Sequence, residues 1–246
     1  MPRPCAGVIS QMTKPILLMT RTRAGSDRFV SGLDAERMQG VNVLFRPLLE
    51  IIPTETRPEI AGYGGVIFSS SNGVAFAPEG AGRMAYCVGE RTAQQAKARG
   101  WQVDLIAQDA QKLIEALIKA APIGPLLHIA GAHRRGDIAQ NLSAAGIPTE
   151  VHVAYTQPLL PLAEDAKKVL FGEVIVIVPL FSPRVAAQFG AQAVCGAHVR
   201  VLAMSQAVKD ALEGTTCAGR VQIASDPTGE EMRIGVENLL WGDSLP

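Results

Sequence analysis

The sequence has few aromatic residues and no excess of charge of either sign. Phenylalanine, tyrosine and tryptophan make up 5% of the 246 residues, and 23 lysines and arginines balance 23 aspartates and glutamates. A partner such as nucleic acid or an anionic membrane usually requires a basic excess, so we expect neither. No apolar run approaches the roughly 20 residues of a membrane span. The 48% hydrophobic content excludes a disordered chain and predicts one large core or two ordinary ones.

The four cysteines are few, far apart and without a CxxC pair. Cys5, Cys87, Cys195 and Cys217 fit a reducing compartment better than a disulfide framework or a zinc site, and we interpret them as small buried residues. The histidines show no ligand spacing, so no metal site is expected. His128 stands in an apolar strand and is interpreted as a core or rim histidine with a satisfied side chain. We expect a cytoplasmic protein, since no signal-like apolar stretch precedes residue 12.

The common cofactor motifs are also missing. No GxGxxG follows a strand, and no GxSxG elbow is present. Gly131 to Gly136 has P-loop spacing, but Asp137 stands where that loop requires lysine. We therefore expect no cofactor. The missing phosphate loop also disfavours a nucleotide-dependent α/β enzyme, which stays an alternative hypothesis.

Short apolar runs alternate with alanine-rich helical stretches, which predicts an α/β protein with parallel sheets. Strands are expected over 15–20, 42–45, 65–68, 84–88, 103–106, 125–129, 149–153, 174–178, 199–203 and 220–223. Helices are expected over 24–38, 92–99, 111–120, 137–145, 163–171, 184–189, 206–213 and 230–241. So many strands favour two sheets of about five strands each over one open sheet.

The chain reads as two copies of one α/β unit, offset by about 110 residues. Residues 66–100 match 174–214 in the order of their elements, and 16–50 match 126–158. Proline-marked extended stretches stand at equivalent places in the two copies. We therefore expect two similar parallel-sheet α/β domains, with boundaries as follows: a disordered extension over 1–13, a discontinuous domain over 14–46 and 158–241, a second domain over 53–152, and linkers over 47–52 and 153–157.

Polar turns follow the carboxyl ends of several predicted strands, where open α/β sheets bind ligands. Hydroxyls, small residues and arginines there adjoin helix N-termini, whose backbone N–H groups favour anions. The same residues could instead serve only as helix caps. We interpret the turns as a wide cleft for a flexible small molecule with several carboxylates. The candidate binding residues are Arg21, Ser70, Ser71, Asn72, Gly89, Thr92, Gly131, Arg135, Ser182 and Ser205.

Tyr155 is the candidate catalytic residue. It follows the predicted strand 149–153 and lies on the expected linker, where a phenol facing the cleft can act as a general acid. The alternative is a linker tyrosine that packs its ring and leaves its hydroxyl at the surface.

With these motifs in this order, the chain from about Pro15 to Leu240 resembles the uroporphyrinogen-III synthase family. The segments that carry the resemblance are 16–21, 46–51, 66–74, 88–93, 153–155, 181–184 and 224–231. The resemblance implies two α/β domains joined by a two-stranded linker. It also implies a lyase of porphyrin biosynthesis that closes hydroxymethylbilane to uroporphyrinogen III, with inversion of ring D and loss of water, and without cofactor or metal.

The resemblance further implies that Tyr155 assists the loss of the hydroxyl group, and that Ser70, Thr92 and Ser182 line the cleft. The alternative function is a non-catalytic two-domain protein that binds or senses a tetrapyrrole. Hydroxymethylbilane closes spontaneously to isomer I, so the product isomer distinguishes the two hypotheses. Under either hypothesis we expect a monomer that binds a small molecule.

Overall fold

The computed structural model describes residues 14–134 and 136–242, which form α/β structure. The chain divides into two compact units: the second unit is Ile51–Pro158, and the first ends at Glu50 and resumes at Leu159. The chain therefore crosses between the units twice. The expected extension over 1–13 and the candidate residue Arg135 lie outside the described residues.

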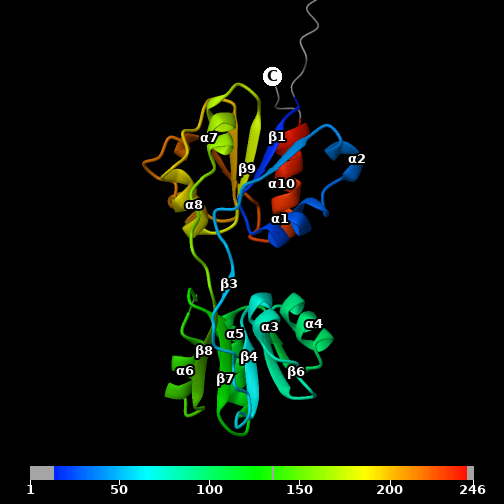
Figure 1. Cartoon of the computed structure of the whole chain (residues 1–246), viewed down its shortest axis with the longest axis vertical. Helices are drawn as coiled ribbons and strands as arrows, with labels where there is room; N and C mark the ends of the chain where they lie inside the picture. The colour runs from blue at the N-terminus through cyan, green and yellow to red at the C-terminus, as the bar shows by residue number, and fades with distance from the viewer. Residues whose placement is uncertain (1–13, 135, 243–246) are drawn as a thin grey trace, which may run out of the picture. The chain divides into compact units, whose positions relative to one another are not determined.

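The first unit is a parallel five-stranded sheet with helices on both faces (Figure 1). Its strands are β1 (Ile16–Met19), β2 (Asn42–Phe45), β9 (Val176–Leu180), β10 (Val199–Ala203) and β11 (Val221–Ile223), in the order β11-β10-β9-β1-β2. Its helices are α1 (Arg23–Val30), α2 (Ala35–Met38), α7 (Glu164–Phe171), α8 (Pro183–Gly190), α9 (Gln206–Asp210), α10 (Gly229–Trp241) and the 3₁₀ helix η1 (Ala218–Arg220). Leu17 and Met19 pack with α1 and α10, whereas Leu18 packs with α7 and α8. Both faces of the sheet are buried, which explains its continuous apolar strands.

The second unit is a six-stranded sheet, again covered on both faces (Figure 1). Its strands are β3 (Ile52–Pro53), β4 (Gly65–Phe68), β5 (Met84–Val88), β6 (Gln102–Ala107), β7 (Leu126–Gly131) and β8 (Thr149–Thr156), in the order β3-β8-β7-β4-β5-β6. Its helices are α3 (Ser71–Phe76), α4 (Glu90–Ala98), α5 (Ala110–Ala120) and α6 (Ile138–Ala144). Phe68 and Ile129 pack on the side of α3 and α4, and Ile67 and Leu126 on the side of α5 and α6.

The two units repeat one topology. Matching β9, β10, β11, β1 and β2 with β4, β5, β6, β7 and β8 makes the order of the five strands the same in both sheets. These are the pairs that the sequence repeat predicts, 174–214 with 66–100 and 16–50 with 126–158. The prediction of two similar parallel-sheet α/β units is therefore confirmed.

All ten predicted strands are present, and the structure adds the short strand β3. This strand pairs antiparallel with β8, so the two crossing segments lie side by side at this point. β8 continues to Thr156, which places Tyr155 within a sheet. The single helix predicted over 24–38 is wrong: the chain forms α1 and α2, because residues 31–34 turn and the Asp34 side chain caps α2 by accepting from the N–H groups of Glu36 and Arg37.

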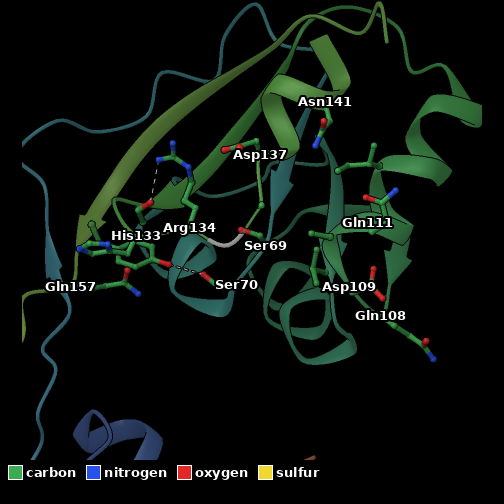
Figure 2. Close-up of a pocket in the computed structure, with 16 residues that line it drawn as sticks. Ser69, Ser70, Gln108, Asp109, Gln111, His133, Arg134, Asp137, Asn141 and Gln157 are labelled. Atoms are coloured by element: carbon green, nitrogen blue, oxygen red, sulfur yellow. Dashed lines mark hydrogen bonds between the residues drawn. The ribbon is translucent and has the colours of Figure 1, made fainter. Parts of the chain in front are cut away.

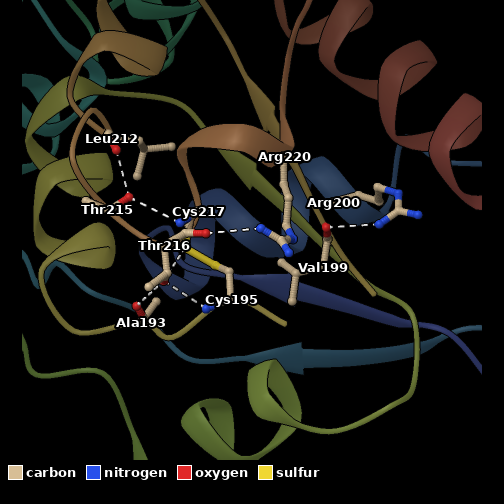
Figure 3. The surroundings of a disulfide bond; sticks show 9 residues. All are labelled: Ala193, Cys195, Val199, Arg200, Leu212, Thr215, Thr216, Cys217 and Arg220. Carbon is tan, nitrogen blue, oxygen red and sulfur yellow. Dashed lines mark hydrogen bonds between the residues drawn. A yellow bond between two sulfur atoms is a disulfide. The ribbon is translucent and has the colours of Figure 1, made fainter. Parts of the chain in front are cut away.

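The expectation of unpaired cysteines is wrong for Cys195 and Cys217, which form a disulfide in the first unit (Figure 3). Cys195 follows α8 and Cys217 precedes η1, and their Cα atoms are 5.1 Å apart. The side chain of Thr216 ties the same segments together, because its Oγ1 accepts from the Cys195 N–H at 3.0 Å and donates to the Ala193 carbonyl at 3.2 Å. Cys87 is a free, buried thiol as expected, and its burial raises its pKa to about 12.

Candidate active site

A pocket of about 680 Å³ opens in the second unit (Figure 2). Several of its lining residues stand at or just after the carboxyl ends of strands: Ser69 and Ser70 after β4, Gly131 at the end of β7, and Tyr155 and Gln157 at the end of β8. Because β8, β7 and β4 are neighbours and β7 is parallel to both, these ends share one edge of the sheet. The pocket therefore occupies the edge at which open α/β sheets bind ligands.

The Tyr155 hydroxyl lies 2.9 Å from Ser70 Oγ, and either oxygen can donate. Ser70 is also the N-cap of α3, where its Oγ accepts from the Gly73 N–H at 3.2 Å. The phenol ring is 4% exposed and packs against Phe76, with the ring centroids 5.6 Å apart. The structure thus places a fixed phenol in the wall of the pocket, with its hydroxyl bonded to a second pocket residue.

Gly131 makes room for this phenol. A Cβ atom at position 131 would lie 2.5 Å from Cε2 and 2.7 Å from Cζ of Tyr155, distances that side chains do not adopt. The absence of a side chain at the end of β7 therefore allows the tyrosine ring of β8 to lie against the neighbouring backbone.

His128 stands on β7, is 2% exposed and does not line the pocket. Its Nε2 is 2.8 Å from Ser69 Oγ. Burial, and in second place the charge of Arg134, lower the pKa of His128 from 6.5 to about 4, so the ring is neutral at pH 7. The interpretation of His128 as a core or rim histidine with a satisfied side chain is confirmed, and its burial places it in the core.

The far end of the pocket consists of residues that the sequence reasoning missed. Gln108, Asp109, Gln111 and Asn141 line it, and Figure 2 shows them away from His133 and Gln157. Asp109 caps α5 by accepting from the Lys112 N–H at 2.8 Å. The pair Gln108 and Asp109 follows β6, so the same rule of polar residues after a strand could have found it.

The charges of the described pocket lining are mixed. Among the described lining residues, Arg134 contributes one positive charge, and Asp109 and Asp137 contribute two carboxylates. The remaining polar groups are hydroxyls, carboxamides and the imidazole of His133, with carboxamides supplied by Gln108, Gln111, Asn141 and Gln157. Hydrogen-bond donors of neutral side chains therefore outnumber cations at this site.

Four other predicted residues of the second unit are described and do not line the pocket: Ser71, Asn72, Gly89 and Thr92. Ser71 and Asn72 begin α3, and Thr92 is buried within α4. Gly89 precedes α4 with a φ of 81°, a conformation that favours glycine, and its N–H donates to the Ala107 carbonyl at 2.8 Å.

Arg21, Ser182 and Ser205 lie in the first unit, after β1, β9 and β10. These strands are neighbours and parallel, so the three residues follow one edge of that sheet. The Arg21 guanidinium stacks 4.1 Å from the centroid of the Phe181 ring. Ser182 caps α8 by accepting from the Val185 N–H at 3.3 Å, and Ser205 occupies the N-cap position of α9.

The described part of the chain has neither a candidate metal centre nor a candidate membrane span. In residues 14–134 and 136–242, no group of three or more histidines, cysteines, aspartates or glutamates could hold a metal ion. None of the helices within these ranges has the length and apolar character needed to cross a membrane.

Solved structures share this fold. A crystal structure of uroporphyrinogen-III synthetase from Helicobacter pylori 26695 matches with 16% identity and a TM-score of 0.67, covering 92% of this chain and 99% of that one. A mutant uroporphyrinogen III synthase from the extremely thermophilic bacterium Thermus thermophilus matches with 14% identity and a TM-score of 0.53, covering 92% and 98%. No curated protein matches the sequence significantly. The family described as uroporphyrinogen-III synthase HemD matches over residues 32–232. The chain therefore belongs to the uroporphyrinogen-III synthase family, whose members are lyases of tetrapyrrole biosynthesis.

Proposed function

We propose that the pocket beside Tyr155 binds hydroxymethylbilane and that Tyr155 assists the departure of its hydroxyl group during closure to uroporphyrinogen III. Membership of the family supports the reaction and its small-molecule substrate. The observation that carries the role of Tyr155 is its hydroxyl, held 2.9 Å from Ser70 Oγ in the wall of a pocket of about 680 Å³.

The chemistry requires a proton at the leaving oxygen. The carbon–oxygen bond of the hydroxymethyl group breaks as a pyrrole pushes electrons toward that carbon, and the oxygen leaves as water after taking a proton from Tyr155. The carbon atom then bonds to the ring D carbon that already carries the methylene bridge to ring C. That bridge bond breaks and re-forms at the free α-carbon of ring D, and loss of the proton from this carbon restores aromaticity and returns a proton to the phenolate. Ser70 Oγ can accept from or donate to the neutral phenol, and it can donate to the phenolate that remains after the proton has left.

The substrate carries eight carboxylates, and we assign their binding in this pocket to Arg134 and to the neutral donors of the hydroxyls and carboxamides. These contacts must outweigh the repulsion from Asp109 and Asp137. We also propose that Arg21, Ser182 and Ser205 of the first unit contact the substrate. The same proposal includes the remaining predicted binding residues Ser71, Asn72, Gly89 and Thr92. The monomeric state and cytoplasmic location expected from the sequence are likewise proposed.

The experiment supplies purified protein with hydroxymethylbilane and separates the product isomers. The enzyme should yield isomer III, and the replacement Tyr155→Phe should lower kcat by about 10²-fold, the lower range for general acid catalysis, with little change in substrate binding. Tyr63→Phe is the matched control. It removes a hydroxyl that donates to Glu150 at 2.6 Å, and neither of these two residues lines the pocket.

Two results would contradict the proposal. A product consisting of isomer I alone would favour the non-catalytic tetrapyrrole-binding alternative. An unchanged kcat in Tyr155→Phe, with isomer III still formed, would return Tyr155 to a packing role.

A further inference from the structure

We infer that Ser69 contacts the substrate within the pocket, and that His128 is a positioning residue that fixes the direction of the Ser69 hydroxyl. This inference rests on the proposed function and extends it to a second pair of residues in the same pocket. It assigns His128, which does not line the pocket, a role that acts through Ser69.

The strand register brings the two side chains together. Ile67 of β4 pairs with His128 of β7, and Ser69 follows Ile67 by two residues, so it projects from the same face of the sheet. The side chain of Ser70 projects from the other face, toward Tyr155. Two consecutive serines are thus bonded to two different strands, Ser69 to β7 and Ser70 to β8.

The bond to His128 restricts what the Ser69 hydroxyl can offer to a ligand. A serine hydroxyl has one donor and two acceptor positions, and it rotates freely unless a partner holds it. The imidazole takes one of these positions at 2.8 Å, and the others remain for a ligand in the pocket. When Nε2 accepts, the Ser69 oxygen can accept from a pyrrole N–H; when Nε2 donates, its hydroxyl can donate to a carboxylate.

The surroundings of His128 argue against a role in packing alone. The residues that share its side of the sheet include the buried apolar side chains of Ile67, Leu126 and Leu142. An aliphatic residue would fill such a position without the cost of burying a polar ring. The hydrogen bond that satisfies this ring leads to a residue of the pocket lining, which is where a fixed hydroxyl would matter.

The test is a double-mutant cycle with hydroxymethylbilane, using Ser69→Ala, His128→Phe and both together. Each single variant should raise KM by about three- to tenfold, the effect of one hydrogen bond, with a smaller change in kcat. The double variant should be no worse than either single one, because the two residues act through one contact. His128→Gln should restore the wild-type KM, since its amide can bond Ser69 as Nε2 does.

An unchanged KM in Ser69→Ala would overturn the inference, and so would losses that multiply in the double variant. If His128→Phe does not fold, His128→Leu takes its place in the cycle, because leucine suits the apolar surroundings and cannot bond Ser69. If the wild-type protein forms isomer III and Ser69→Ala has the wild-type KM, this inference is refuted and the proposed function stands. Wild-type protein that forms only isomer I refutes the proposed function.

Discussion

The burial of His128 predicts that the second unit loses stability in mild acid. In the unfolded chain the imidazole takes up a proton near its ordinary pKa of 6.5, whereas in the folded protein burial holds the pKa at about 4. Between these values the unfolded state binds more protons than the folded state, so the free energy of unfolding falls as the pH falls. Above pH 6.5 the ring is neutral in both states and contributes no pH dependence.

The magnitude follows from the two pKa values. At pH 5 the proton taken up by the unfolded chain favours unfolding by about 2 kcal/mol relative to pH 7.5, and the effect approaches about 3 kcal/mol below pH 4. The side chain is 2% exposed, so solvent screens this penalty little. A loss of about 2 kcal/mol is a large share of the 5–15 kcal/mol by which domains are typically stable.

The assay is urea unfolding at pH 5.0 and pH 7.5, comparing wild-type protein with His128→Gln. The glutamine keeps a hydrogen-bonding group beside Ser69 but does not titrate. Between pH 7.5 and pH 5.0 the free energy of unfolding of this variant should therefore fall by about 2 kcal/mol less than that of the wild type. His152→Gln, on the neighbouring strand β8, controls for the loss of a histidine as such. Equal pH dependence in wild type and His128→Gln would refute the reasoning, because the buried ring would then take up its proton without unfolding.

Two further predictions concern the disulfide and Gly131. The disulfide closes a loop with a sequence separation of 22, so replacing Cys195 and Cys217 by serine should lower the unfolding free energy by about 3 kcal/mol. A reductant should lower the melting temperature of wild type but not of the double variant, and a reductant without effect would contradict a stabilising disulfide. Gly131→Ala should displace the Tyr155 ring and lower kcat at least about tenfold, as expected when a group that assists the chemistry is misplaced. Gly219→Ala is its control because an added Cβ there meets nothing within 4 Å, and equal kcat in the two variants would show that the ring tolerates the methyl group.

Much of the fold can be read from short stretches of the sequence. A buried parallel strand needs a continuous apolar run, and a helix that covers it needs a periodic one, so windows of a few residues located all ten predicted strands. The repeat then paired 66–100 with 174–214, which the strand order of the two sheets confirms. The exceptions were local: the turn at 31–34 divided a predicted helix, and neither the six-residue helix α3 nor the two-residue strand β3 has a predicted range, because each carries little pattern of its own.

The site was predicted less completely than the fold. Strand ends pointed to Ser70, Gly131 and Tyr155, which all line the pocket, because a turn after a parallel strand is recognisable by itself. Thr92 met the same rule but lies buried in α4. Gln111 was missed because it lies inside a helix, where a polar residue usually marks the solvent side.

The sequence by itself determined which segments become strands and helices, that the unit is repeated, and at which strand ends polar residues gather. Only the tertiary structure decided that Tyr155 bonds Ser70, that His128 bonds Ser69, and that Cys195 meets Cys217. The physical reason is range. Apolar periodicity and turn chemistry act between near neighbours in the chain, whereas each of these contacts joins residues 22 to 85 positions apart and depends on the register and packing of elements.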